Sequence, residues 1–102
     1  MIRYNIEKDI TEDPTLVCTF MKRLDTAICQ EIENDLFSKV QNTKIPVVFN
    51  MQDVDYVASS FLSICLRVAK KVGTENFSII NVHPNVKKVF KIAKFDKQLT
   101  IT

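Results

Sequence analysis

The segment Val47-Val-Phe-Asn-Met-Gln-Asp-Val-Asp-Tyr-Val-Ala-Ser-Ser-Phe-Leu62 contains the sharpest change of pattern in this sequence. It begins in a nearly continuous apolar run, which is typical of a strand buried on both faces in a parallel sheet. Residues 52–58 then predict a loop. Two serines, Ser59 and Ser60, precede apolar residues at helical spacing. We therefore expect a helix that begins at one of these serines and ends near Gly73.

Patterns on either side of this segment predict the remaining elements. Apolar and polar residues alternate from Ile2 to Ile6, and residues 15–20 are rich in β-formers, so we expect the two to pair as a hairpin. Asp25 is a good N-cap for an amphipathic helix of about four turns. Residues 77–82 predict another strand, and His83-Pro84 opens a third helix with proline at its first position.

The predicted order is strand, strand, helix, strand, helix, strand, helix, followed by a short extended tail. Strands joined through helices indicate an α/β sandwich with right-handed crossovers. We expect one domain over residues 1–102, with a mixed sheet of four or five strands and three or four helices. The N-terminal hairpin of that sheet should be antiparallel and its inner strands parallel.

The composition is ordinary for a soluble globular domain, with 46 % hydrophobic and 25 % charged residues. Fourteen Lys and Arg against 12 Asp and Glu give a formal net charge of +2. No apolar run is long enough to span a bilayer, and the N-terminus lacks the apolar stretch of a signal peptide. These features favour the cytoplasm, with membrane contact only through a partner complex.

Several kinds of chemistry lack the residues that they require. Cys18, Cys29 and Cys65 are widely spaced, which argues against a zinc site and favours buried, reduced thiols. One glycine cannot form a Gly-rich phosphate loop, and the sequence has no Gly-x-Ser-x-Gly motif. The five lysines of residues 87–97 are weak evidence for nucleic-acid binding. We expect no cofactor, no metal, no direct nucleic-acid contact and no enzymatic activity.

The two serines at the start of the second helix admit two interpretations. Serine is a good N-cap residue, which would make the pair a purely structural feature. Alternatively, the pair is a switch, because a helix N-terminus tolerates added negative charge. A phosphate there adds almost two charges and changes the surface offered to a partner without necessarily unfolding the domain.

The sequence resembles the STAS domain family, the bacterial anti-sigma factor antagonists. The central match is Ala58-Ser-Ser-Phe-Leu62, which stands where the family has Asp-Ser-Ser-Gly-Leu. Other matching segments, in the family's order, are Leu24-Asp-Thr-Ala27, Phe49-Asn-Met51, Val54, Tyr56-Val57, Ile79-Ile-Asn-Val-His-Pro-Asn-Val86, Ala93-Lys-Phe-Asp96 and Leu99-Thr-Ile101. The resemblance extends over nearly the whole chain and implies a STAS-like sandwich.

The resemblance implies partner switching. In the family, the unphosphorylated domain binds an anti-sigma factor that is also a serine kinase, and this releases the sigma factor. Phosphorylation of the second serine of the motif ends the interaction, and a phosphatase restores it. That serine is Ser60 here, with Ser59 as the nearby alternative. The implied protein is a non-enzymatic regulator of transcription, which we expect to be a monomer or a weak dimer.

The expected partner surface comprises Asp25, Asp53, Asp55, Tyr56, Ala58, Ser59, Ser60 and Phe61. Asn50, Ala58 and Phe61 replace the family's Asp, Asp and Gly. The first two replacements are expected to lower the negative charge beside the serines. Phe61 is expected to add bulk where a kinase approaches. It anchors the interface if its ring is exposed and belongs to the core if it is buried.

Two other functions remain open from the sequence. The first is a STAS-like subunit of a stressosome-type scaffold or a lipid-transport ATPase complex, without phosphoregulation. Residues 51–102 hold eight basic and four acidic side chains, a net charge of +4, and the basic final helix suits such an assembly. The second is an enzyme of unrecognised type. The partner captured from cells would separate these possibilities.

Overall fold

Strand β3 (Val47–Val57) is the central strand of a five-stranded mixed sheet in the computed structural model, which describes residues 2–8 and 13–102. The other strands are β1 (Ile2–Lys8), β2 (Pro14–Leu24), β4 (Phe77–Ile80) and β5 (Thr100–Ile101), and the spatial order follows the numbering. β1 pairs with β2 antiparallel, and every other neighbouring pair is parallel. The predicted hairpin and parallel inner strands are therefore confirmed.

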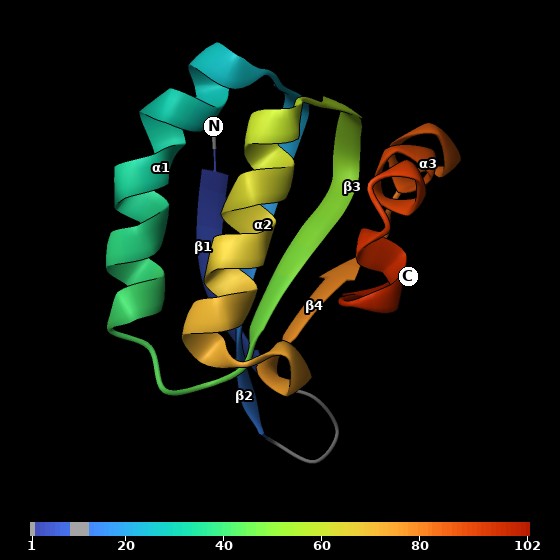
Figure 1. Ribbon diagram of the computed structural model, residues 1–102. Helices are drawn as coiled ribbons and strands as arrows, with labels where there is room; N and C mark the ends of the chain where they lie inside the picture. Colours follow the sequence, from blue (N-terminus) through green and yellow to red (C-terminus); the bar gives the residue numbers. More distant parts are fainter. Residues whose placement is uncertain (1, 9–12) are drawn as a thin grey trace.

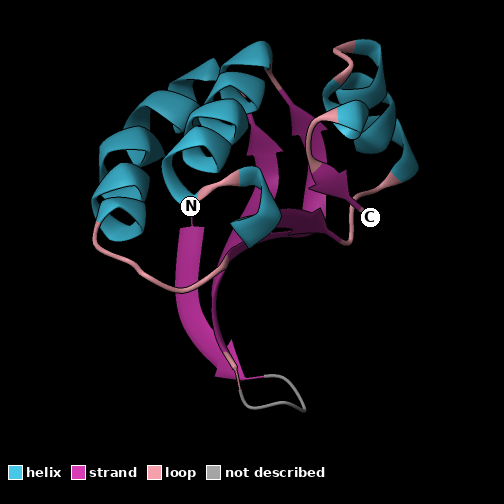
Figure 2. Ribbon diagram, turned by 60° about the horizontal axis from the view of Figure 1, so that its bottom comes forward, coloured by secondary structure: helices cyan, strands magenta, loops and turns pink. Residues whose placement is uncertain are grey.

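Three α-helices accompany the sheet: α1 (Thr26–Gln41), α2 (Ser59–Val72) and α3 (Pro84–Ile92). Short 3-10 turns follow α2 and α3, at Thr74–Asn76 and Phe95–Lys97. α1 and α2 lie side by side over one face of the sheet, whereas α3 lies apart from them beside β3 (Figures 1 and 2). The core lies mainly between the sheet and the α1–α2 layer, and it contains a cluster of aromatic rings in edge contact.

The helix ends follow the local chemistry that predicted them. The Asp25 carboxylate accepts a hydrogen bond of 2.9 Å from the Ile28 N–H and so caps α1. Gly73 ends α2 with φ at 92°, a conformation that side chains rarely adopt, and an added Cβ would come within 2.8 Å of the Glu75 carboxylate. Pro84 stands at the start of α3, where its missing N–H leaves no helical bond unmade.

β2 and β3 are both longer than predicted. The loop expected over residues 52–58 is wrong, because all of these residues except Ala58 belong to β3. β3 continues to Val57 and β2 continues to Leu24. The pairing of the two strands shifts register twice, and each shift leaves an extra residue on β3. These bulges bury Met51, Val54 and Val57 at intervals of three residues instead of two. The polar residues between them are exposed, which is why the segment has the composition of a loop.

The three cysteines are buried and carry no disulfide, as the sequence predicted. Burial raises the pKa of Cys18 to about 12 and holds the pKa of Cys65 well above its ordinary value. Burial, with the Asp25 and Glu33 carboxylates nearby, raises the pKa of Cys29 to about 11. Among the described residues, no group of His, Cys, Asp or Glu side chains is arranged to hold a metal ion. None of the helices in the described ranges is long and apolar enough to cross a membrane.

Candidate functional site

The starts of α1 and α2 meet at the carboxyl end of strands β2 and β3 (Figure 1). Parallel strands end at the same edge of a sheet, so the helices that follow them begin side by side. The Ala58 N–H donates a hydrogen bond of 2.9 Å to the Leu24 carbonyl and ties the two strand ends together. This edge is the place to which the sequence assigned its candidate site.

Ser60 lies at the point where the two helices meet. Its hydroxyl donates a hydrogen bond of 3.2 Å to the Thr26 hydroxyl, which begins α1. Ser60 is half-buried, and its neighbour Ser59 is exposed. Asp25, the cap of α1, precedes Thr26 in the chain. The structure therefore brings Ser59, Ser60 and Asp25 to one small surface.

The interpretation of the serines as N-caps is wrong. Ala58 occupies the N-cap position of α2, and Ser59 and Ser60 are the first two residues of the helix. Because alanine has no side-chain acceptor, α2 begins without a side-chain cap. The two hydroxyl groups are therefore not required to cap the helix that contains them.

A shallow cavity and an aromatic side chain adjoin the helix starts. The Arg23 guanidinium lies 4.3 Å from the centre of the Tyr56 ring, a cation–π distance, and Tyr56 is 41 % exposed. A cavity of about 430 Å³ is lined by Met21, Lys22, Arg23, Asp25 and Ile28. Apolar and basic side chains thus extend the candidate surface from α1 along the end of β2.

Asp53 and Asp55 lie on β3, the strand that leads to the serines. Both are exposed on the bulged half of β3, and the backbone carbonyl of Asp55 accepts a hydrogen bond of 2.8 Å from the Asn85 side chain. Asp53 stands four residues before the end of the strand, which corresponds to roughly 13 Å of extended backbone. The two aspartates are available to a partner that also covers the helix starts, but they form a separate part of the surface.

Phe61 belongs to the core and not to the partner surface. Its ring is fully buried, with ring centres 5.1 Å from Phe20 and 5.9 Å from Phe49. The expectation that it adds bulk in the path of a kinase is therefore wrong. Its side chain points inward because the helix start turns its apolar side towards the sheet.

Asn50 also differs from its expected place. It stands seven residues before the end of β3, roughly 23 Å of extended backbone, so its lack of charge does not act beside Ser60. Its side-chain oxygen accepts hydrogen bonds of 3.1 Å from the Gln52 N–H and from the Asn81 side chain. Asn50 therefore links β3 to the turn after β4.

Comparisons with known proteins agree with this geometry. The family model of the STAS domain matches residues 5–102. The chain belongs to the STAS domain family. BtrV of Bordetella bronchiseptica, named as an anti-sigma factor antagonist, is 26 % identical over 85 residues, which cover 81 % of this chain and 73 % of BtrV.

Solved structures show that this STAS domain shares its fold with anti-sigma factor antagonists. A STAS domain protein from Planctomyces limnophilus superposes with a TM-score of 0.79 at 18 % identity, covering 100 % of this chain and 90 % of that one. The anti-sigma factor antagonist SpoIIAA in its unphosphorylated form gives 0.73 at 17 % identity, covering 98 % and 88 %. The phosphorylated form of SpoIIAA from Bacillus gives 0.65 at 16 % identity, covering 98 % and 91 %.

Two residues of this surface in the STAS domain were not singled out as contact residues from the sequence. Thr26 meets Ser60 although 34 positions separate them, and no pattern in a single sequence pairs such residues. Arg23 contacts Tyr56 only because β2 continues past its predicted end. The predicted N-cap at Asp25 did mark the start of α1 and so placed Thr26 in the first turn of that helix. It did not indicate the contact with Ser60.

Proposed function

We propose that this STAS domain is a regulatory binding module for an anti-sigma factor of the serine-kinase type, and that phosphorylation of Ser60 ends the binding. The observation that carries the proposal is the position of the Ser60 hydroxyl, at the surface where α1 and α2 begin. The relationship to BtrV and to SpoIIAA, which has been solved with and without phosphate, supports the same assignment.

The chemistry of the switch is a phosphoryl transfer from ATP bound to the partner. The Ser60 oxygen forms a bond to the γ-phosphorus, the bond from that phosphorus to the bridging oxygen breaks, and ADP leaves. The hydroxyl proton passes to a base of the partner. The hydrogen bond from Ser60 to Thr26 must open first. The unpaired N–H groups at the start of α2 favour the charge of the product. Ser59, which is exposed beside it, is the alternative acceptor.

The added phosphate weakens binding through the cost of desolvating a charge. An interface matched to a neutral hydroxyl offers no partner for almost two negative charges. Burying an unmatched charge costs several kcal/mol, and even ~3 kcal/mol corresponds to more than a hundredfold in affinity.

The test combines the protein with its anti-sigma partner and ATP and locates the phosphate by mass spectrometry. We expect labelling of Ser60, no labelling at that position in Ser60→Ala, and binding weakened at least ~100-fold in Ser60→Asp. Ser63→Ala is the matched control, because Ser63 is exposed on the same helix one turn later. Equal labelling of Ser60→Ala and wild type, or unchanged binding of Ser60→Asp, contradicts the proposal.

A second candidate function is that of a structural subunit in a larger assembly without phosphoregulation. The exposed side of α3 favours it: Ile92 is 76 % exposed, and Lys88 and Lys91 are exposed on the same helix. This surface lies apart from the start of α2 (Figure 1). Capture of a transporter ATPase or a large oligomer from the source cell, instead of a kinase-like ATPase, would support this alternative.

A further inference from the structure

Strand β1 forms an open edge of the sheet. Its seven residues pair with β2 on one side, and no described strand pairs with the other side. An edge strand of this length presents unpaired backbone N–H and C=O groups. Ile6, one residue after the central Asn5, is 64 % exposed, although it faces the same side of the sheet as the half-buried Tyr4. The edge therefore offers both backbone hydrogen bonds and an uncovered apolar side chain.

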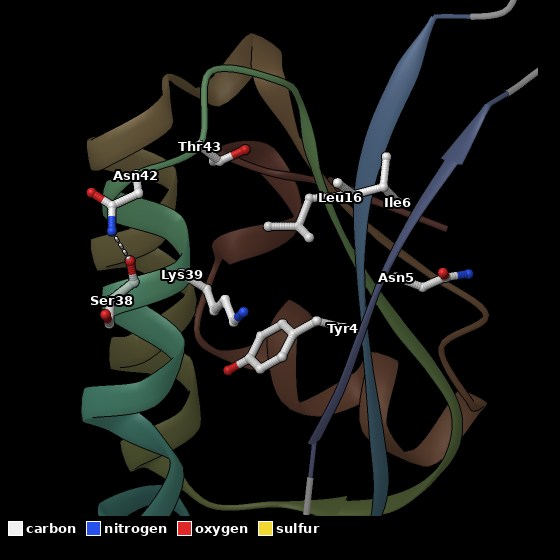
Figure 3. Close-up of a pocket in the computed structure, with 8 residues that line it drawn as sticks. All are labelled: Tyr4, Asn5, Ile6, Leu16, Ser38, Lys39, Asn42 and Thr43. Carbon is white, nitrogen blue, oxygen red and sulfur yellow. Dashed lines mark hydrogen bonds between the residues drawn. The ribbon is translucent and has the colours of Figure 1, made fainter.

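A groove lies beside this edge, between the hairpin and the last turns of α1 (Figure 3). Its volume is about 660 Å³. Tyr4, Ile6 and Leu16 line it from the sheet, and polar side chains line it from the helix and the residues just after it: Ser38, Lys39, Asn42 and Thr43. Tyr4 points towards α1, and the Lys39 ammonium lies 5.5 Å from the centre of its ring. The helix thus covers Tyr4 but leaves Ile6 at the rim.

We propose that β1 pairs antiparallel with β1 of a second copy of this chain, around a two-fold axis at Asn5. In this register Arg3 of each copy faces Glu7 of the other, and Tyr4 faces Ile6. The charged pairs lie on the side of the sheet away from the groove, and the apolar pairs lie on the groove side, because side chains alternate along a strand. Each exposed Ile6 is then covered beside the Tyr4 ring of the other copy.

Charge complementarity selects this partner and this register. Arg3 and Glu7 are both exposed and stand two positions on either side of Asn5, so the strand is complementary to itself when reversed. A shift of the axis to Tyr4 would place Arg3 opposite Asn5. A shift to Ile6 would place Glu7 opposite Asn5. Both shifts lose the two Arg–Glu pairs, and cross-strand pairs of opposite charge stabilise antiparallel sheets.

The interface is small, so the dimer is weak. Seven residues of one strand with one apolar contact from each copy bury less surface than a stable protein–protein interface requires. We expect a dimer that forms only at high protein concentration. The surface is separate from the start of α2, so the inference does not depend on the proposed function of Ser60.

The test measures self-association by sedimentation equilibrium over a wide range of protein concentration. We expect wild type to dimerise, and Arg3→Glu or Glu7→Arg alone to weaken the dimer by about tenfold or more, since each places like charges opposite one another twice. An equimolar mixture of the two variants should form a heterodimer, because a strand with two acidic side chains at positions 3 and 7 then faces a strand with two basic ones. Lys88→Glu is the control, a charge reversal at an exposed position on α3.

The mixture distinguishes lost pairing from lost folding. If each variant keeps the far-ultraviolet circular dichroism of wild type and the mixture associates, the register is supported. A wild type that stays monomeric at every concentration overturns the proposal, as does a dimer that both variants leave unchanged. If the two variants remain monomeric when mixed, the Arg3–Glu7 register is wrong. The double variant Arg3→Glu/Glu7→Arg repeats that test in one chain, and it should dimerise like wild type.

Discussion

The start of α2 lacks a side-chain cap because of a single residue. Ala58 has the extended backbone of an N-cap, with φ at −89° and ψ at 165°, but no side chain that can accept a hydrogen bond. Ser60, two positions later, directs its hydroxyl to Thr26 instead of to the backbone of its own helix. Its hydroxyl therefore serves a contact between helices, and phosphorylation would replace that contact without removing a cap.

Replacement of Ala58 by Asp should stabilise the protein. A carboxylate at an N-cap accepts a hydrogen bond from the N–H two or three residues later and interacts favourably with the helix dipole. We expect the free energy of unfolding to rise by about 1 kcal/mol. Urea denaturation measures the change, and Ser63→Asp, which adds the same charge without a capping position, should gain less. A loss of stability in Ala58→Asp would show that the half-buried site rejects the charge.

Removal of the Phe61 ring should destabilise the protein without altering the partner contact directly. The ring is fully buried against Phe20 and Phe49, so Phe61→Ala leaves a cavity and costs about 3–5 kcal/mol. Phe61→Leu fills most of the space and should cost less. Partner affinity is measured on the folded fraction of each variant. A normal stability for Phe61→Ala combined with weaker binding would contradict the assignment to the core.

At the scale of elements, the sequence predicted helices better than strands for a physical reason. α1 begins after its Asp25 cap, and α2 ends where Gly73 adopts a positive φ. Both are local signals, because each depends on one residue that can be recognised in the sequence. The ends of β2 and β3 depend on pairing between segments about 30 residues apart. Two register shifts in that pairing change the burial pattern of β3 from every second to every third residue, and no local rule anticipates this.

The same difference between local signals and long-range pairing explains which site residues were placed correctly from the sequence. Ser59, Ser60 and Asp25 came together because each marks a helix start, and parallel strands bring helix starts to one edge. Asp53 and Asp55 were predicted to lie in a loop beside the serines, but β3 continues through both and places Asp53 four residues before its end. The burial of Phe61 follows from packing against two strands, so its position in the sequence left both outcomes open.

At the scale of the whole molecule, buried thiols in the core make the protein less stable at high pH. Three buried thiols have a pKa above the ordinary value of 9.0, with about 12 for Cys18 and about 11 for Cys29. Burial also raises the pKa of Tyr4. The folded state therefore keeps protons that the unfolded chain releases. Stability from these groups is fully present below the unfolded pKa and is lost as pH rises from about 9 towards the folded values.

The free energy of unfolding should fall between about pH 9 and about pH 11, with a slope that includes up to ~1.4 kcal/mol per pH unit for each thiol. Urea denaturation at several pH values gives that slope. Cys18→Ala isolates the contribution of the Cys18 thiol, because every other titratable side chain is the same in both proteins. The variant is less stable at every pH because it leaves a cavity, but its slope above pH 9 should be shallower. An equal slope would mean that the Cys18 thiolate is tolerated in the folded core. Rapid alkylation of native Cys18 near pH 9 would mean that the thiol is reached by solvent, and either result would contradict the burial from which its high pKa follows.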